Sequence, residues 1–306
     1  MSDAKKLVYY SFYHAGGPLY GRRAWQIQGS IESLRRFNGN IEIVFCLFGS
    51  AFPDHLMRFF SHQRVDFRHL GTYEEHLLKI VDAPVDIMTR YPAIHKWTCI
   101  NQLDNLGNTD VLYLDNDTYF FDDVEKLFES DSSSVRAREE PYSRRSEFGY
   151  DAEYIDETAL AALASEIGSR FIPPFNTGVV LMPAGVLPSV RQQLAEFVEL
   201  IWRFSLWMAN HPSQSDTPDV RLIRGRTGLQ GQELRYPGGN RWIKEQLAIG
   251  LALGKIPDCK VDYYTRSDVL QGLEFMSTVP AQCDATVVHF FTANFVEFYR
   301  WLQHGG

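Results

Sequence analysis

Short apolar runs recur along the chain, and glycine, proline or asparagine residues stand beside several of them. The runs at residues 7–12, 41–48 and 111–114 are almost free of polar residues, which is typical of strands buried on both faces of a parallel sheet. Further strands are predicted at residues 65–70, 134–137, 179–182, 260–264 and 287–291. The pattern therefore favours a protein built around a largely apolar sheet.

Between these runs, apolar residues return at helical spacing. Trp25, Ile27, Ile31, Leu34 and Phe37 define one helix, which the Asn-Gly-Asn sequence at residues 38–40 is expected to end. Apolar residues from 94 to 106 step by three and predict an amphipathic helix that ends at the glycine at position 107. Further helices are predicted at residues 53–60, 122–128, 156–167, 190–208, 241–255 and 295–302.

This alternation of strands and helices predicts an α/β fold in which helices flank a mostly parallel central sheet. The first strand, helix and second strand form a βαβ unit, whose crossover should be right-handed. We find no internal repeat and no convincing linker, so we expect one domain over residues 1–306.

Two carboxylates directly follow the apolar run at residues 111–114. Asp115 and Asp117, separated by Asn116, stand at the carboxyl end of a predicted strand, where open α/β sheets bind ligands. In an extended backbone, residues i and i+2 point the same way, so both carboxylates can converge on one point. Convergent carboxylates suit a hard divalent cation, so the D-x-D predicts a metal site that holds a nucleotide diphosphate. The alternative is a pair of turn aspartates that cap the strand.

Residues elsewhere in the chain are predicted to reach the same edge of the sheet. Tyr9, Ser11 and Tyr13 lie where the first strand ends, and we expect them to contact a nucleotide base and ribose. Lys96, near the start of a predicted helix, could reach a phosphate there. The alternatives are core-edge side chains for the first three and a solvated surface lysine for Lys96. No G-x-G-x-x-G opens the helix after the first strand, so a NAD site is not favoured.

Two later segments add polar candidates. The sequence Phe-Asn-Thr-Gly precedes the predicted strand at residues 179–182, and its glycine permits close approach of the backbone. Asn176 offers both a donor and an acceptor to a sugar hydroxyl or a pyrophosphate. His289 alternates with Val288 and Phe290 along the last predicted strand, so it faces the opposite way.

Composition narrows the classes of partner. A formal net charge of −8 argues against a nucleic-acid backbone as the main partner, and no apolar stretch approaches a membrane span. The first residues lead directly into a strand, so no secretory signal is expected. The four cysteines show no C-x-x-C spacing and suit buried thiols in a reducing compartment, which predicts a cytoplasmic protein. Peripheral contact of the helix at 190–208 with a membrane is the alternative, although that helix lacks a basic face.

Taken in order, Y-L-D-N-D-T, F-N-T-G-V-V-L-M, K-E-Q-L-A and V-H-F-F resemble the motifs of the GT-A glycosyltransferases. The closest resemblance is to the glycogenin and bacterial lipooligosaccharide galactosyltransferase type, and it spans the chain from Leu7 to about His289. It implies a Rossmann-like GT-A fold for transfer from nucleotide-diphospho-sugars. Residues 1–121 are then expected to form the nucleotide-sugar-binding half, and residues 122–306 the acceptor side.

The resemblance also implies roles for individual residues. Asp115 and Asp117 would hold a divalent metal, and His289 would be its third protein ligand. The metal would be Mn²⁺ or Mg²⁺, and the imidazole favours manganese. Asn116, between the two aspartates, is expected to be a donor-binding residue, and Asn176 would contact the donor sugar or the acceptor.

The predicted catalytic residues come from the same resemblance. Glu245 and Gln246 stand where the family has an aspartate-glutamine pair near the anomeric carbon, and Glu139 or Glu140 where it often has a sugar-binding acid. The implied reaction moves a sugar from a nucleotide-diphosphate sugar, by default a UDP-sugar, to a hydroxyl of a glycan, lipid-linked or protein acceptor. Retention of configuration is expected, and an inverting enzyme would need a base such as Glu245 or Glu139. The Gly- and Pro-rich segment 210–240 is expected to shape acceptor choice.

Two departures from the family pattern leave alternatives open. Thr292 and Phe295 replace the glycine and the phosphate-binding lysine that follow the family's histidine, so donor binding would depend on the metal and on Lys96, Lys244 or Arg241. The predicted pair also has glutamate in place of aspartate. One alternative is a catalytically inactive nucleotide-sugar-binding scaffold. The other is a haloacid-dehalogenase-like phosphohydrolase that uses the first aspartate of the D-x-D-T sequence, Asp115, as its nucleophile.

Overall fold

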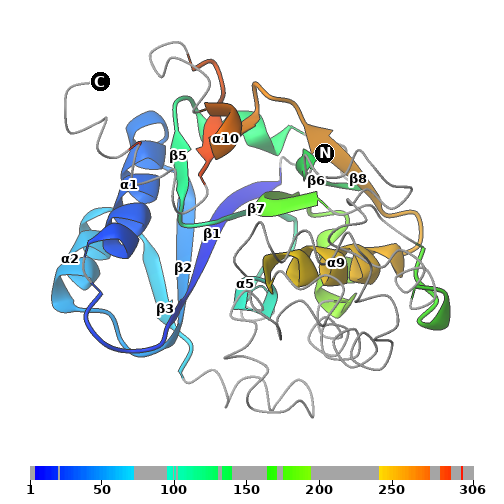
Figure 1. The fold of residues 1–306 in the computed structure, drawn as a ribbon, viewed down its shortest axis with the longest axis horizontal. Helices are drawn as coiled ribbons and strands as arrows, with labels where there is room; N and C mark the ends of the chain where they lie inside the picture. Colours follow the sequence, from blue (N-terminus) through cyan, green and yellow to red (C-terminus); the bar gives the residue numbers. More distant parts are fainter. Residues whose placement is uncertain are drawn as a thin grey trace, which may run out of the picture.

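The computed structural model describes residues 4–19, 21–71, 95–98, 100, 103–129, 133–139, 164–170, 175–193, 241–275, 283–290 and 298. Within these residues, a seven-stranded sheet crosses the molecule (Figure 1). Its order is β3 (Asp66–His69), β2 (Glu42–Gly49), β1 (Lys5–His14), β4 (Thr109–Leu114), β7 (Phe175–Met182), β6 (Ser134–Glu139) and β8 (Lys260–Tyr264).

Most of the strand pairings are parallel, as predicted. Strand β1 is parallel to β2 and to β4, β2 to β3, and β6 to β8, whereas β7 runs antiparallel to both β4 and β6. Strands β1, β4 and β6 therefore all end at the same edge of the sheet. Ligand-binding residues of open α/β sheets gather at such an edge.

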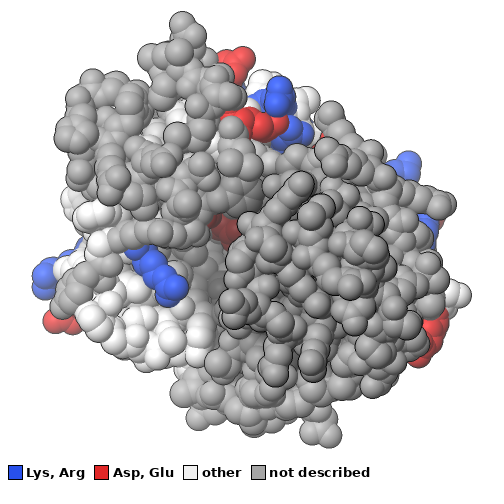
Figure 2. All heavy atoms as spheres, viewed as in Figure 1, with Lys and Arg blue, Asp and Glu red and all other residues white. Residues whose placement is uncertain are grey.

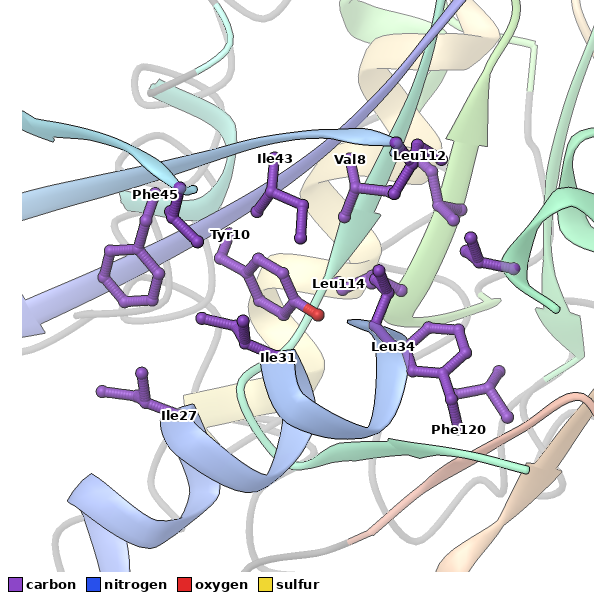
Figure 3. Close-up of a cluster of buried hydrophobic side chains, with 14 of the residues drawn as sticks. Val8, Tyr10, Ile27, Ile31, Leu34, Ile43, Phe45, Leu112, Leu114 and Phe120 are labelled. Atoms are coloured by element: carbon purple, nitrogen blue, oxygen red, sulfur yellow. The ribbon is translucent and has the colours of Figure 1, made fainter. Parts of the chain in front are cut away.

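Helices cover both faces of this sheet, which explains why its inner strands β2, β1, β4 and β7 are mostly apolar. On one face, α1 (Arg22–Phe37) and α2 (Asp54–His62) share a core with Val8 and Tyr10 of β1. On the other, α5 (His95–Thr98) and α9 (Arg241–Gly254) pack with the alternate residues Leu7 and Tyr9. Figure 3 shows the first of these cores, in which Ile27, Ile31 and Leu34 of α1 meet Val8, Tyr10, Ile43, Phe45, Leu112, Leu114 and Phe120.

A smaller, three-stranded sheet begins shortly after β4. Its order is β5 (Thr118–Phe120), β10 (Val287–His289) and β9 (Val269–Gln271), with β10 antiparallel to β5 and parallel to β9. The short helix α10 (Gly272–Phe275) follows β9. In this sheet His289 pairs with Thr118, so the register brings the histidine beside the D-x-D.

Some boundaries differ from the predictions. The helix predicted to continue to residue 106 is wrong, because residues 103–106 are not helical and Asn105 has a φ of 57°. Ile100 and Leu103 are nevertheless buried in the core, so their spacing reflects burial and not a helix. The predicted helix after Asp123 is a 3-10 helix (Val124–Phe128), which the Asp123 side chain caps by accepting the Glu125 N–H. Strand β9 and helix α10 were not predicted.

Several predictions fall outside the described residues, namely segment 210–240, residues 156–163 of the predicted helix 156–167, the greater part of the predicted helices 190–208 and 295–302, Glu140, Thr292 and Phe295. The single domain and its two halves stay a prediction. Cys46, Cys259 and Cys283 are free thiols. Among the described helices, none combines the length and the apolar character that crossing a bilayer requires.

Candidate metal and donor site

The D-x-D forms a turn between β4 and β5. Asp115 directly follows β4, Asn116 and Asp117 form the turn, and β5 begins at Thr118. The Thr118 N–H and hydroxyl both donate to the carbonyl oxygen of Asp115, at 3.3 and 3.0 Å. The prediction that an extended backbone aims the two carboxylates the same way is therefore wrong in its cause. The turn brings them together.

Three potential metal ligands meet at this turn. One oxygen of Asp115, one of Asp117 and one ring nitrogen of His289 all lie within 4.8 Å of one another. His289 Nε2 is 3.5 Å from Asp115 Oδ2 and 3.4 Å from Asp117 Oδ1. Two carboxylates and an imidazole suit a divalent metal such as Mn²⁺, so the residues present fit the metal that the sequence analysis predicts.

Gly178 of β7 lies against the imidazole ring of His289. A Cβ at this position would lie 2.2 Å from Cε1 and 2.4 Å from both ring nitrogens of His289. The Gly178 carbonyl also accepts the Asp115 N–H at 2.8 Å. The glycine of the Phe-Asn-Thr-Gly sequence is thus required for the imidazole to reach its place.

Lys96 and Tyr113 surround Asp115 with hydrogen-bond donors. The Nζ of Lys96 is 2.9 Å from Asp115 Oδ2 and 3.5 Å from Thr177 Oγ1, and the Tyr113 hydroxyl donates to Asp115 Oδ1. Burial opposes ionisation of Asp115. Nevertheless, the charge of Lys96 and hydrogen bonds from His289 and Tyr113 hold the pKa of this carboxyl well below its usual range. Asp115 is therefore an anion at neutral pH.

The pKa of His289 shifts in the opposite direction, upward. Burial alone would lower its pKa, but hydrogen bonds to Asp115 and Asp117, followed by the charges of these carboxylates, raise the pKa of His289 to about 9. The two carboxylates thus favour a positive charge at the position of the imidazole. Figure 2 shows acidic atoms at the bottom of a hollow in this face of the molecule.

The predicted residues of β1 lie beside the turn. Ser11 is buried, and its carbonyl oxygen accepts a 2.8 Å hydrogen bond from Asn116 Nδ2. Asn116 Oδ1 is buried and has no hydrogen-bond partner among the described residues, so it is an acceptor that a ligand could use. Tyr9 is buried beneath Lys96 and donates to its backbone carbonyl at 3.0 Å, and Tyr13 packs at the rim of the same core. Their contacts with a donor stay predictions.

The other predicted residues lie on neighbouring elements. Asn176 is buried on β7, where its Oδ1 accepts the Gly178 N–H at 3.0 Å. Glu139 ends β6, and its carbonyl accepts from Gln271 Nε2 at 3.3 Å. Gln246 is buried on α9. The side chains of Glu245, Lys244 and Arg241 on the same helix lie outside the described part of the structure.

Two residues that shape the candidate site were not predicted from the sequence. Tyr113 holds Asp115 Oδ1, and Thr118 closes the turn. A tyrosine two positions before the first aspartate, in an otherwise aliphatic run, and a threonine directly after the second were the available signals.

The sequence and the fold were compared with those of known proteins. No family model matches the sequence, and no curated protein matches it. Solved structures do match. The bifunctional glycosyltransferase WbbM has a TM-score of 0.53 at 13% identity, over 96% of this chain and 49% of its own. An active-site mutant of LgtC has a TM-score of 0.50 at 14% identity, over 96% of this chain and 95% of its own.

A third similar structure is mouse xyloside xylosyltransferase 1, with a TM-score of 0.51 at 11% identity, over 93% of this chain and 97% of its own. LgtC is a galactosyltransferase, and one of its structures holds donor and acceptor sugar analogues. The chain thus spans about half of WbbM and nearly all of the other two. At these identities the likeness concerns the fold, and it extends over nearly the whole chain. The protein has the GT-A glycosyltransferase fold.

Proposed function

We propose that the protein is a metal-dependent glycosyltransferase that moves a sugar from a nucleotide-diphosphate sugar, with UDP as the first candidate, to a hydroxyl acceptor. One observation carries the proposal: Asp115, Asp117 and His289 offer ligand atoms within 4.8 Å of one another at the carboxyl end of β4. In an α/β sheet this is the edge where ligands bind.

The three side chains would hold Mn²⁺ or Mg²⁺, and the imidazole favours manganese. A bound divalent metal supplies charge that stabilises a departing diphosphate. The two carboxylates, the Lys96 ammonium and a divalent ion together leave a net positive site, which favours a diphosphate. Lys96 therefore supports donor binding even though Phe295 stands where the family has its phosphate-binding lysine.

The remaining assignments rest on the resemblance. Asn116 and Asn176 would contact the donor, while Glu245 and Gln246 on α9 and Glu139 at the end of β6 would act near the anomeric carbon. Retention of configuration and a glycan, lipid-linked or protein acceptor are part of the same proposal. No described contact favours the phosphohydrolase alternative, and the inactive scaffold is an outcome of the test below.

The test is a thermal-shift screen of UDP, GDP, CDP and dTDP, each with and without Mn²⁺. One nucleotide should raise the unfolding temperature only when the metal is present. Asp117→Ala should abolish this increase. Asp122→Ala is the matched control, because Asp122 is a nearby carboxylate that pairs with Lys126 at the surface, and it should keep the increase.

Absence of stabilisation by every nucleotide, or full stabilisation of Asp117→Ala, would refute the proposed site. A second measurement, release of the nucleotide from its sugar conjugates, tests the enzyme itself. Metal-dependent nucleotide binding with no release from any conjugate would replace the transferase by the inactive scaffold.

A further inference from the structure

A chain of buried hydroxyl groups connects helix α1 to the D-x-D turn. The Tyr10 hydroxyl is 3.0 Å from Ser30 Oγ, and Ser30 Oγ is 2.7 Å from Thr118 Oγ1. Thr118 Oγ1 is in turn 3.0 Å from the carbonyl oxygen of Asp115. The side chains of Tyr10, Ser30 and Thr118 are fully buried, each in a residue with 0% exposure.

The direction of this chain follows from counting protons. Each hydroxyl has one proton to donate, and a backbone carbonyl can only accept. Thr118 must therefore donate to the Asp115 carbonyl, so Ser30 donates to Thr118 and Tyr10 donates to Ser30. All three protons are used, and the chain ends on the metal-site turn.

Apolar side chains surround the three hydroxyl groups, so few other hydrogen-bond partners among the described residues are close to them. Tyr10 extends from β1 into the apolar cluster shown in Figure 3, among Ile31 and Leu34 of α1 and Leu114 of β4. Burial raises the pKa of the Tyr10 phenol, which therefore stays a protonated donor. In such a cluster, a hydroxyl that loses its partner keeps the full cost of its burial.

Thr118 connects both parts of the proposed metal cluster. Its hydroxyl and its N–H hold the Asp115 carbonyl, and its place in β5 pairs it with His289 of β10. We propose that Tyr10, Ser30 and Thr118 are positioning residues, whose hydroxyl chain holds the D-x-D turn in the shape that gathers the two aspartates with His289. The consequence for metal binding rests on the proposed function, whereas the hold on the turn does not.

Ser33 offers a matched control on the same helix. It is also fully buried, and its hydroxyl donates to the Ser30 carbonyl at 2.8 Å and accepts the Phe120 N–H at 3.0 Å. Ser33 thus ties α1 to the far end of β5 without a bond to the turn. Loss of this hydroxyl should lower stability and leave the turn in place.

The experiment compares Thr118→Val, Ser30→Ala, Thr118→Ser and Ser33→Ala with the wild type. Two readouts are measured: Mn²⁺ affinity, and amide hydrogen exchange at residues 115–118 in metal-free protein. Thr118→Val and Ser30→Ala should weaken Mn²⁺ binding roughly tenfold or more, as loss of an outer-shell partner of a metal ligand does. They should also speed exchange in the turn. Thr118→Ser, which keeps the hydroxyl, and Ser33→Ala should match the wild type in both readouts.

Unchanged exchange and affinity in Thr118→Val would overturn the proposal. An equal loss in Ser33→Ala and Ser30→Ala would also overturn it, because the hydroxyls would then act through general stability alone. If the wild type binds no Mn²⁺, the proposed function fails. Exchange in the turn then still decides whether the hydroxyl chain holds it.

Discussion

Replacement of Gly178 by alanine tests whether the imidazole of His289 belongs to the metal site. The new Cβ would lie 2.2 Å from His289 Cε1, and ordinary contact begins at 3.4 Å, so the ring must retreat by about 1.2 Å. A zinc–nitrogen bond, which indicates the scale of such bonds, is only about 2.0–2.1 Å long. A ring displaced by half of that distance no longer binds the metal. Moving the strand instead would strain β7, which is paired on both sides.

We therefore expect Gly178→Ala to weaken Mn²⁺ binding on the order of 100-fold, the upper range for disturbing the partners of a metal ligand. The overpacking should also cost about 1–3 kcal/mol of unfolding free energy. Titration calorimetry gives the Mn²⁺ affinity with and without UDP, and thermal unfolding of the metal-free protein gives the stability. Gly107→Ala is the control, since a Cβ there meets nothing within 4 Å, and it should change neither quantity.

The double variant Gly178→Ala/His289→Ala separates the two effects. Removal of the imidazole relieves the collision, so the double variant should regain stability relative to Gly178→Ala. Metal binding should stay weak, because the third ligand is gone. If Gly178→Ala binds Mn²⁺ as tightly as the wild type, the imidazole is not a ligand and the reasoning is refuted.

Two further outcomes are expected. Lys96→Ala should lower UDP affinity roughly tenfold at saturating Mn²⁺, because about one charge-assisted hydrogen bond is lost. Calorimetry with UDP measures this affinity. An unchanged affinity would show that Lys96 does not bind the donor. The pKa of His289 is raised from 6.5 to about 9, so its imidazolium stabilises the metal-free protein. This contribution is fully present below pH 6.5 and is lost as the pH rises through 9. Since a metal needs the neutral imidazole, the increase in unfolding temperature that Mn²⁺ produces should grow between pH 6.5 and 8.5, and a pH-independent increase would contradict this assignment.

The pattern of apolar residues predicts burial, and it predicts a helix or strand only where burial and local structure coincide. The runs that became β1, β2 and β4 were readable because helices bury both faces of the sheet, so the side chains in the middle of these strands are almost all apolar. At residues 94–106, the spacing of apolar residues wrongly predicted a helix up to residue 106. Ile100 and Leu103 are buried there, but residues 103–106 are not helical. Strand β9 has only three residues, Val269–Gln271, which is too short for alternation to be recognised.

The grouping of the three candidate metal ligands was predictable, and the geometry that brings them together was less so. Asp115, Asp117 and His289 come together as expected, because the carboxyl end of a central strand is where ligand-binding groups of such sheets gather. The turn that aims them was missed, since D-x-D was read as extended backbone while Thr118 closes it through its N–H and its hydroxyl. Hydroxyls that bond to nearby backbone favour turns over strands.

The D-x-D turn is held from three sides before any metal arrives. Strand β7 accepts the Asp115 N–H through the Gly178 carbonyl, β10 donates the Phe290 N–H to the Asp117 carbonyl at 2.8 Å, and Thr118 holds the Asp115 carbonyl. The backbone of the turn is therefore already in place, and the change that a metal would require is one of charge: His289 would give up a proton, and Lys96 would share Asp115 with the ion. Without the metal, Lys96 and the protonated His289 balance the two carboxylates, so the cluster offers a diphosphate no net positive charge. We therefore expect the metal to bind before or together with the nucleotide.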